Sequence, residues 1–222
     1  MGTLHLLPSG LWAACLSPIG CEEACHLSET SLEEAGLLPT HVLEDLFEAF
    51  DPPSIVNKWG RQTWQDESGR LHRAYDLPAL VLADGARSWY QHGQEHRDFD
   101  RPAIVPSDDD RYGRFFWYQQ GFVHREGGRP AMVSVDGDEY WYVHGKQHRD
   151  EDLPAVMLHD GGKHWYKHGL FHRDDDLPAV MNADGSSRWY MQGKLHRERG
   201  PAILNADGSN EWWLRGVRVK RS

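Results

Sequence analysis

One short pattern repeats along most of this chain, and internal repetition constrains architecture before local propensity does. The dipeptide His-Arg occurs in six copies, spaced 24 residues apart except for one step of 28. Pro-Ala follows every copy, and an aromatic pair precedes the next glycine. The arginines are Arg73, Arg97, Arg125, Arg149, Arg173 and Arg197; the prolines are Pro78, Pro102, Pro130, Pro154, Pro178 and Pro201; the aromatic pairs are Trp89-Tyr90, Trp117-Tyr118, Trp141-Tyr142, Trp165-Tyr166, Trp189-Tyr190 and Trp212-Trp213.

Each unit contains two glycine turns that bracket one short strand. In the unit from Pro154 to Arg173, Asp160-Gly161 separates an apolar run from an aromatic run, which is a strong hairpin signal. We expect both central residues of this turn to have positive φ, which glycine adopts without a Cβ clash. The second turn, at His168-Gly169, is a weaker form of the same signal. Each unit is therefore predicted to add about two strands to an antiparallel sheet.

The predicted fold is mainly β, an elongated and twisted antiparallel sheet of tandem hairpin repeats with a small helical N-terminal cap. Side chains alternate across a strand, so Trp165 and Tyr166 should point to opposite faces, as should the corresponding pairs. Because neighbouring strands lie ~4.8 Å apart, equivalent residues of successive units should be ~10 Å apart. The ends of an open sheet need protection against pairing, and Arg215, Arg218, Lys220 and Arg221 would provide it at one edge.

Charge divides the chain into two parts. Residues 1–57 contain nine Asp or Glu and no Lys or Arg, whereas residues 58–222 contain 24 basic and 25 acidic side chains. We therefore expect an acidic cap at 1–57 and a nearly neutral domain of six repeats at 58–222. Nucleic acid is not expected as a partner, nor is a membrane, because neither part offers the basic face that phosphate groups attract.

The three cysteines lie in the acidic part and have no partner in the repeats. This odd number favours a reducing, intracellular and cytoplasmic location. Cys15, Cys21, Cys25 and His26 could supply four zinc ligands, but their spacing matches no zinc finger closely. Buried free thiols are the favoured interpretation.

Residues 183–197, Ala-Asp-Gly-Ser-Ser-Arg-Trp-Tyr-Met-Gln-Gly-Lys-Leu-His-Arg, resemble the MORN repeat: a glycine-turned hairpin, an aromatic strand and then Gly-Lys-x-His. The resemblance covers about residues 59–222. Arginine, an acidic spacer and Pro-Ala stand where the family has Gly-x-Gly, so the chain resembles a divergent MORN-like class. The resemblance implies an elongated antiparallel sheet used for protein contacts, dimerisation or, in some members, membrane association.

Residues 37–56 resemble the first half of an F-box. That resemblance implies short helices that dock on the Skp1 subunit of a ubiquitin ligase, while a C-terminal repeat domain holds the substrate. A plain capping helix explains the same segment, with Thr40 as its N-cap and apolar residues up to Phe50 at helical spacing. The docking candidates under the F-box interpretation are Leu38, Pro39, Val42, Leu43, Leu46 and Phe47.

No catalytic residue, cofactor or metal is predicted. Equivalent histidines ~10 Å apart cannot share a zinc ion, and no nucleophile, phosphate loop or acid pair stands apart from the repeats. We expect each His or Arg instead to bond the acidic spacer or a neighbouring carbonyl. The 28-residue step creates a longer hairpin tip with Asp108, Asp109 and Asp110, for which a solvated loop is favoured over a calcium site.

The predicted function is a non-catalytic protein-protein interaction scaffold, and the alternative is an F-box-type substrate adaptor that recruits a target to a Skp1-containing ligase. An aromatic face is the stronger contact candidate, because Trp and Tyr are enriched at interfaces. Sheet twist, long Arg and Lys side chains or the second subunit of a homodimer would otherwise cover it. The partner-binding candidates are Trp89, Tyr90, Trp117, Tyr118, Trp141, Tyr142, Trp165, Tyr166, Trp189, Tyr190, Asp108, Asp109 and Asp110.

Overall fold

The computed structural model describes residues 51–220, and within this range the chain forms strands and turns without a helix. The predicted mainly β architecture is confirmed for these residues. The predicted helical cap and all the F-box-like docking candidates lie outside the described residues, so they remain predictions. No helix in the described range has the length and apolar character needed to cross a bilayer.

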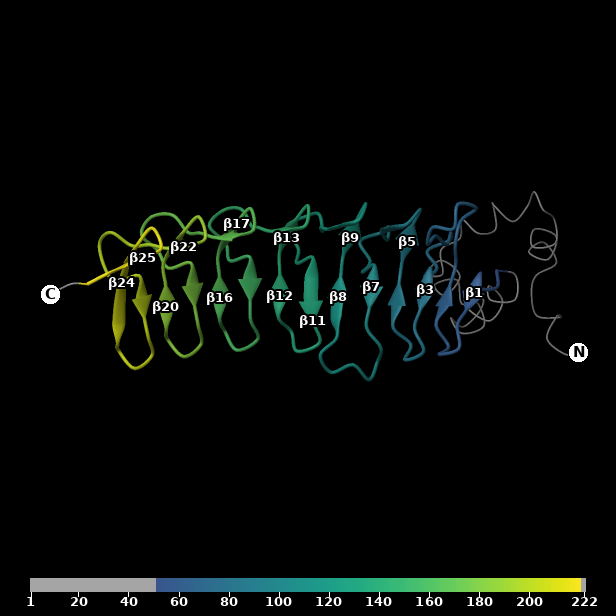
Figure 1. Cartoon of the computed structure of the whole chain (residues 1–222), viewed down its shortest axis with the longest axis horizontal. Helices are drawn as coiled ribbons and strands as arrows, with labels where there is room; N and C mark the ends of the chain where they lie inside the picture. Colours follow the sequence, from purple (N-terminus) through teal and green to yellow (C-terminus); the bar gives the residue numbers. More distant parts are fainter. Residues whose placement is uncertain (1–50, 221–222) are drawn as a thin grey trace, which may run out of the picture.

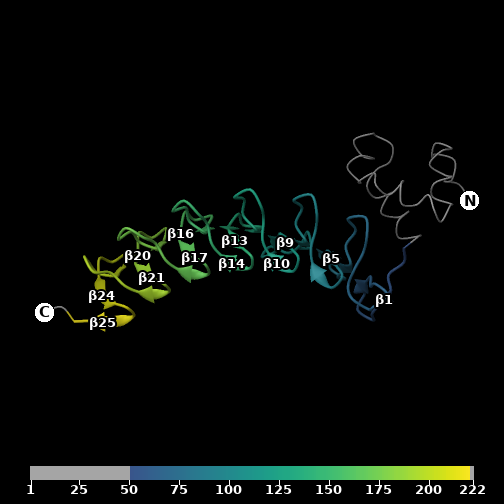
Figure 2. The same ribbon diagram turned by 90° about the horizontal axis from the view of Figure 1, so that it is seen from above.

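Within residues 51–220, fifteen strands form one antiparallel sheet that runs along the whole array (Figure 1). Units add to it in chain order, two strands at a time, as predicted. Seen from above, the array is extended and gently curved (Figure 2). The strands of this main sheet are β1 (Ile55–Val56), β2 (Gln62–Thr63), β3 (Leu80–Val81), β4 (Arg87–Ser88), β7 (Ile104–Val105), β8 (Arg114–Phe116), β11 (Met132–Ser134), β12 (Glu139–Tyr140), β15 (Val156–Met157), β16 (Lys163–His164), β19 (Val180–Met181), β20 (Ser187–Arg188), β23 (Ile203–Leu204), β24 (Asn210–Leu214) and β25 (Val217–Val219).

Ten further strands in the described range form five small hairpins along one edge of the main sheet (Figure 1). The chain leaves the main sheet at the first aromatic residue of each pair except the last, Trp212-Trp213, which lies within β24. Thus β16 ends at His164, Trp165 belongs to no strand, and β17 begins at Tyr166. The hairpin strands are β5 (Tyr90–Gln91), β6 (Gln94–Glu95), β9 (Tyr118–Gln119), β10 (Phe122–Val123), β13 (Tyr142–Val143), β14 (Lys146–Gln147), β17 (Tyr166–Lys167), β18 (Leu170–Phe171), β21 (Tyr190–Met191) and β22 (Lys194–Leu195).

The prediction of a single strand through Trp165 and Tyr166 is therefore wrong. The reason is a set of contacts with neighbouring units. The Trp165 backbone N–H donates to the Ala179 carbonyl of the next unit at 2.7 Å. Its indole N–H donates at 2.9 Å to the carbonyl of Asp152, which lies in the preceding acidic spacer, the segment between a His-Arg pair and the following Pro-Ala. These two bonds hold the tryptophan between units and interrupt the strand there.

The two glycine turns also differ from the prediction. At Asp160-Gly161 only the glycine has positive φ, 96°, and its N–H donates to the Leu158 carbonyl at 2.9 Å. This is a type I turn followed by a glycine in the left-handed conformation. At His168-Gly169 both residues have positive φ, 53° and 89°, as the two-residue loop between β17 and β18 requires. The turn with two positive φ values is thus the one with the weaker sequence signal.

The core lies between the small hairpins and one face of the main sheet. Val156 and Val180 flank His164 in register, and their side chains are 2% and 4% exposed. The His164 ring lies 6.0 Å from the ring of Phe171 in β18, so the hairpin covers this face. The alanines of the Pro-Ala pairs are fully buried: Ala79, Ala103, Ala131, Ala155, Ala179 and Ala202.

The sheet begins at β1, ahead of the boundary expected at residue 58. Ile55 lies opposite Thr63, so β1 and β2 form the first hairpin of the array. Asp51 accepts the indole N–H of Trp64 through its carbonyl at 2.9 Å. Because Asp51 therefore holds a spacer position, the last six residues of the F-box-like segment are residues of the repeat array.

Candidate interaction site

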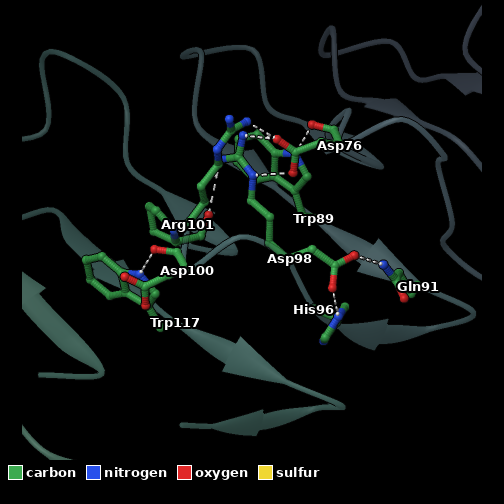
Figure 3. A network of polar contacts seen from close by, with 10 residues as sticks. Asp76, Trp89, Gln91, His96, Asp98, Asp100, Arg101 and Trp117 are labelled. Atoms are coloured by element: carbon green, nitrogen blue, oxygen red, sulfur yellow. Dashed lines mark hydrogen bonds and ion pairs between the residues drawn. The ribbon is translucent and has the colours of Figure 1, made fainter. Parts of the chain in front are cut away.

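A three-residue contact joins consecutive units and uses the arginine of each His-Arg pair. Trp89 donates its indole N–H to the Asp76 carbonyl at 2.7 Å, and Figure 3 shows the two residues side by side. The Arg97 guanidinium covers the Trp89 ring, with Cζ 3.7 Å from the ring centroid. Its Nε and Nη2 donate to the two carboxylate oxygens of Asp76 at 2.7 and 2.9 Å. We call this arrangement the Trp-Arg-Asp clamp.

The clamp recurs along the array and reaches both neighbouring spacers. The arginine Nη1 donates to the carbonyl of the following spacer proline at 3.2 to 3.4 Å in every copy. This confirms that the arginines bond the acidic spacer and a neighbouring carbonyl. The clamp ion pairs are Arg73 with Asp51, Arg97 with Asp76, Arg125 with Asp100, Arg173 with Asp152 and Arg197 with Asp176.

A left-handed turn in the acidic spacer places the clamp aspartate. Glu151 and Asp152 have φ of 60° and 52°, and Asp175 and Asp176 have φ of 60° and 58°. Side chains other than glycine rarely adopt this region, although Asp and Asn tolerate it better than most. The strain is offset by the ion pair that the turn makes possible.

One unit has the clamp without its aspartate. Gly128, with φ of 66°, holds the position that Asp152 holds in the next spacer. Trp141 still donates its indole N–H to the Gly128 carbonyl at 2.8 Å, and Arg149 still covers the Trp141 ring with Cζ 3.8 Å from its centroid. Among the described residues, Arg149 has no carboxylate within ion-pair distance.

In four of the six His-Arg pairs the histidine connects units in a second way, through Nδ1; the Nδ1 atoms of His124 and His148 have no such partner. The Nε2 of His172 lies 2.9 Å from Asp174, and its Nδ1 accepts the backbone N–H of Gln192 from the next hairpin turn at 3.2 Å. Nδ1 is thus the acceptor and Nε2 carries the proton. Figure 3 shows His96 against Asp98 in the same arrangement. In the part of the chain that the structure describes, no three His, Cys, Asp or Glu side chains converge as a metal site would need.

The predicted aromatic candidates face the interior. Four of the tryptophans are 6 to 7% exposed beneath their arginines, and Trp117 is half-buried. The tyrosines are half-buried on the inner side of the hairpins, where the Tyr166 and Phe171 rings stack at 4.2 Å. Burial raises the pKa of Tyr166 to about 12. The buried tryptophans are Trp89, Trp141, Trp165 and Trp189, and the half-buried tyrosines are Tyr90, Tyr118, Tyr142, Tyr166 and Tyr190.

The acidic tip lies in the longer loop between β7 and β8. Asp108, Asp109 and Asp110 are exposed, and the Asp110 carboxylate accepts the Tyr112 backbone N–H at 3.1 Å. Gly113 closes the loop so tightly that a Cβ there would lie 2.4 Å from the Pro106 Cβ. The structure does not bring this tip near the aromatic candidates of the hairpin edge, because the loop lies at the opposite edge of the sheet (Figure 1).

Sequence reasoning missed the exposed residues on the outer faces of the small hairpins and of the hairpin between β24 and β25. Each hairpin presents the residue after its tyrosine and the residue after its turn glycine, which pair across the hairpin, as Lys167 and Leu170 do. Polar residues at some of these positions hide the apolar row in the sequence. An apolar residue directly after a turn glycine was the signal that could have revealed it. Six apolar residues at these positions are 37 to 67% exposed and form what we call the hairpin row: Phe122, Val143, Leu170, Met191, Leu214 and Val217.

Adjacent hairpins touch, so the positions of the hairpin row follow one another along the edge, with lysines between some of its apolar residues. The Gly193 N–H donates to the Phe171 carbonyl of the preceding hairpin at 2.9 Å, and a Cβ on Gly193 would lie 3.4 Å from Leu170 Cδ2. The same relation holds between Gly145 and Phe122, at 3.5 Å. Family models and curated proteins provide no assignment for this surface, since no family model matches the chain and a search of curated proteins finds no significant match.

Proposed function

We propose that this chain is a non-catalytic protein-interaction scaffold built from divergent MORN-like repeats. The hairpin row carries the proposal. Contiguous exposed apolar surface on a soluble protein commonly marks a contact site, whereas single exposed apolar residues do not. The row extends over neighbouring hairpins on one edge of a long sheet, which suits an extended partner better than a small ligand.

The use of polar groups within the repeats supports a scaffold over an enzyme. Each clamp arginine is engaged with a tryptophan ring and a spacer carbonyl, and His172 with a carboxylate and a backbone N–H. Catalysis needs acid, base or nucleophilic groups that meet at one substrate. Groups committed to holding neighbouring units together instead favour a structural role for the repeats.

The composition of the row indicates the chemistry of its partner. Three of its apolar residues lie directly opposite a lysine: Val143 opposite Lys146, Leu170 opposite Lys167, and Met191 opposite Lys194. A partner segment that alternates apolar and acidic side chains would match both features. Two copies of this row would instead bring lysines together, so we favour a different protein over a homodimer through this edge.

Affinity capture with crosslinking tests the proposal on the full chain. The test variant carries Phe122→Ser, Leu170→Ser and Met191→Ser. The control carries Leu82→Ser, Tyr112→Ser and Val135→Ser, which are 39%, 84% and 50% exposed in turns at the opposite edge. We expect a partner that the native chain and the control retain and the test variant loses. Equal capture by all three chains, or by none, would contradict the proposal.

The adaptor hypothesis remains a separate prediction about the segment at residues 37–56, whose docking candidates all lie outside the described residues. It is tested by pull-down with purified Skp1. Binding that Leu38→Ala and Pro39→Ala each weaken would favour the adaptor, while binding to a row partner without any Skp1 binding would favour the scaffold alone.

A further inference from the structure

We propose that Arg149 and the groove beside Gly128 form a binding site for a carboxylate group. In residues 51–220, Arg149 is the one clamp arginine without a carboxylate partner. The other five clamps each place an aspartate against the guanidinium. The same geometry therefore binds a carboxylate in each of the other five copies.

The neighbouring clamp shows what Arg149 lacks. Arg173 uses Nε and Nη2 to hold the Asp152 carboxylate, at 3.0 and 2.8 Å, and Nη1 to hold the Pro178 carbonyl at 3.4 Å. In Arg149 only Nη1 has partners, the Pro154 carbonyl at 3.3 Å and the Met157 sulfur at 3.8 Å. Its Nε and Nη2 have no hydrogen-bond partner among the described residues.

An accessible groove lies beside the Arg149 guanidinium. This groove of about 370 Å³ is lined by Arg149, Trp141, Gly127 and Gly128. A similar groove of about 480 Å³ lies two units further on, but there Asp176 already pairs with Arg197. The groove is therefore a feature of the repeat, and the unpaired guanidinium is what distinguishes the copy at Arg149.

Electrostatics favour an anion at this position. Burial lowers the pKa of Arg149, and the charge of Glu139 only partly opposes this effect, yet a guanidinium remains protonated in proteins. Contact with the Trp141 ring holds the Arg149 guanidinium, a fork of N–H donors, in one orientation. Little side-chain freedom therefore remains to be lost on binding. A preorganised, half-buried fork of two N–H donors suits bidentate recognition of an oxyanion.

The surroundings favour a carboxylate over a phosphate. Five further charged residues line the groove. Arg125 and Arg129 both pair with Asp100. The charge of the other three, Glu126, Asp150 and Glu151, repels a dianion more strongly than a monoanion. Glu126 and Asp150 are partly engaged, at 3.0 Å from His124 Nε2 and 3.1 Å from His148 Nε2. A flat, singly charged group that bonds the fork at short range is therefore the best match.

The site adjoins the hairpin row, because Val143 lines the groove and belongs to the row. A partner lying on the row could insert an Asp or Glu side chain toward Arg149. This identification of the donor rests on the proposed scaffold function, whereas the carboxylate site itself does not.

Titration of the full chain with sodium acetate, followed through arginine Nε–Hε resonances at constant ionic strength, tests the site. Arg149→Lys assigns the resonance. We expect a saturable shift of the Arg149 signal that is lost in Gly128→Asp, where the new side chain occupies the fork as Asp152 does in its unit. Asp152→Gly should create a second responding arginine, Arg173. Asp108→Asn, in the exposed tip at the opposite edge of the sheet, is the control that leaves both responses in place.

An absent or non-saturable shift, an undiminished shift in Gly128→Asp, or a larger response to inorganic phosphate than to acetate would each overturn the assignment. The titration needs no partner protein, so its result is independent of the capture experiment. If acetate binds but the row variant still captures the partner, the carboxylate site stands and the scaffold proposal is rejected. If acetate does not bind but the row variant loses the partner, only the carboxylate site is rejected.

Discussion

Arg197 reaches across the boundary between two repeat units to Asp176, with Nε 3.1 Å from Oδ1 and Nη2 3.2 Å from Oδ2. Both side chains are largely shielded from solvent, 20% and 29% exposed, and the guanidinium also covers the Trp189 ring. A repeat array is stable only if each unit binds its neighbours. Here one arginine supplies several of those contacts at once.

The clamp predicts a difference between two equivalent arginines. Arg197→Gln removes both the ring contact and the ion pair, whereas Arg149→Gln removes a ring contact with no ion pair to lose. We expect Arg197→Gln to lower the free energy of unfolding by about 1 to 2 kcal/mol more than Arg149→Gln does. Urea unfolding followed by tryptophan fluorescence measures both values, and equal losses would show that the aspartate contributes nothing.

Gly113 should be irreplaceable for a steric reason rather than a conformational one. A Cβ at this position would lie 2.4 Å from the Pro106 Cβ, and both groups belong to a closed loop. We expect Gly113→Ala to cost about 1 to 3 kcal/mol of unfolding free energy. Gly162→Ala is the matched control, because its nearest neighbour is the flexible end of Leu158, at 3.0 Å. A loss no larger than that of the control would count against the close contact.

The hairpin turn at Gln192-Gly193 should distinguish residue types by backbone conformation. Gln192 has φ of 48°, a region that β-branched residues strongly disfavour and asparagine tolerates. We expect Gln192→Val to lower the free energy of unfolding by about 1 kcal/mol and Gln192→Asn to leave it unchanged or slightly raised. The side chain is exposed, so packing changes little. Equal urea midpoints for the two variants would contradict the left-handed turn.

Alkaline pH should weaken the array through its tyrosines. Burial raises the pKa of Tyr166 to about 12, while a tyrosine in the unfolded chain ionises near its ordinary value of 10.0. The stabilising effect of this group is therefore complete below pH 10 and is lost as the pH rises toward 12. Absorbance of tyrosinate at alkaline pH should show a late-ionising class that loses one member in Tyr166→Phe. Ionisation of all tyrosines together near pH 10 would disprove the burial effect.

Local sequence predicted the regular features because they depend on short-range rules. The 24-residue period, the two main-sheet strands per unit and the bonding of His-Arg pairs to spacer and carbonyl groups all follow from residues close together in the chain. The turn types could not be predicted from the local sequence. Asp160-Gly161 has the stronger motif, but the loop length between the paired strands decides the turn, and that length depends on register.

The repeat pattern by itself determined that this chain forms an antiparallel array in which each unit supports the next. Only the tertiary structure decided which side chains remain exposed. Alternation along a strand relates Trp165 to Tyr166 but does not say where the strand breaks, and the break depends on bonds to Asp152 and Ala179 in neighbouring units. Those bonds turn the aromatic rings inward, leave Leu170 and its equivalents outside, and hold Arg149 in position beside a glycine that offers it no carboxylate.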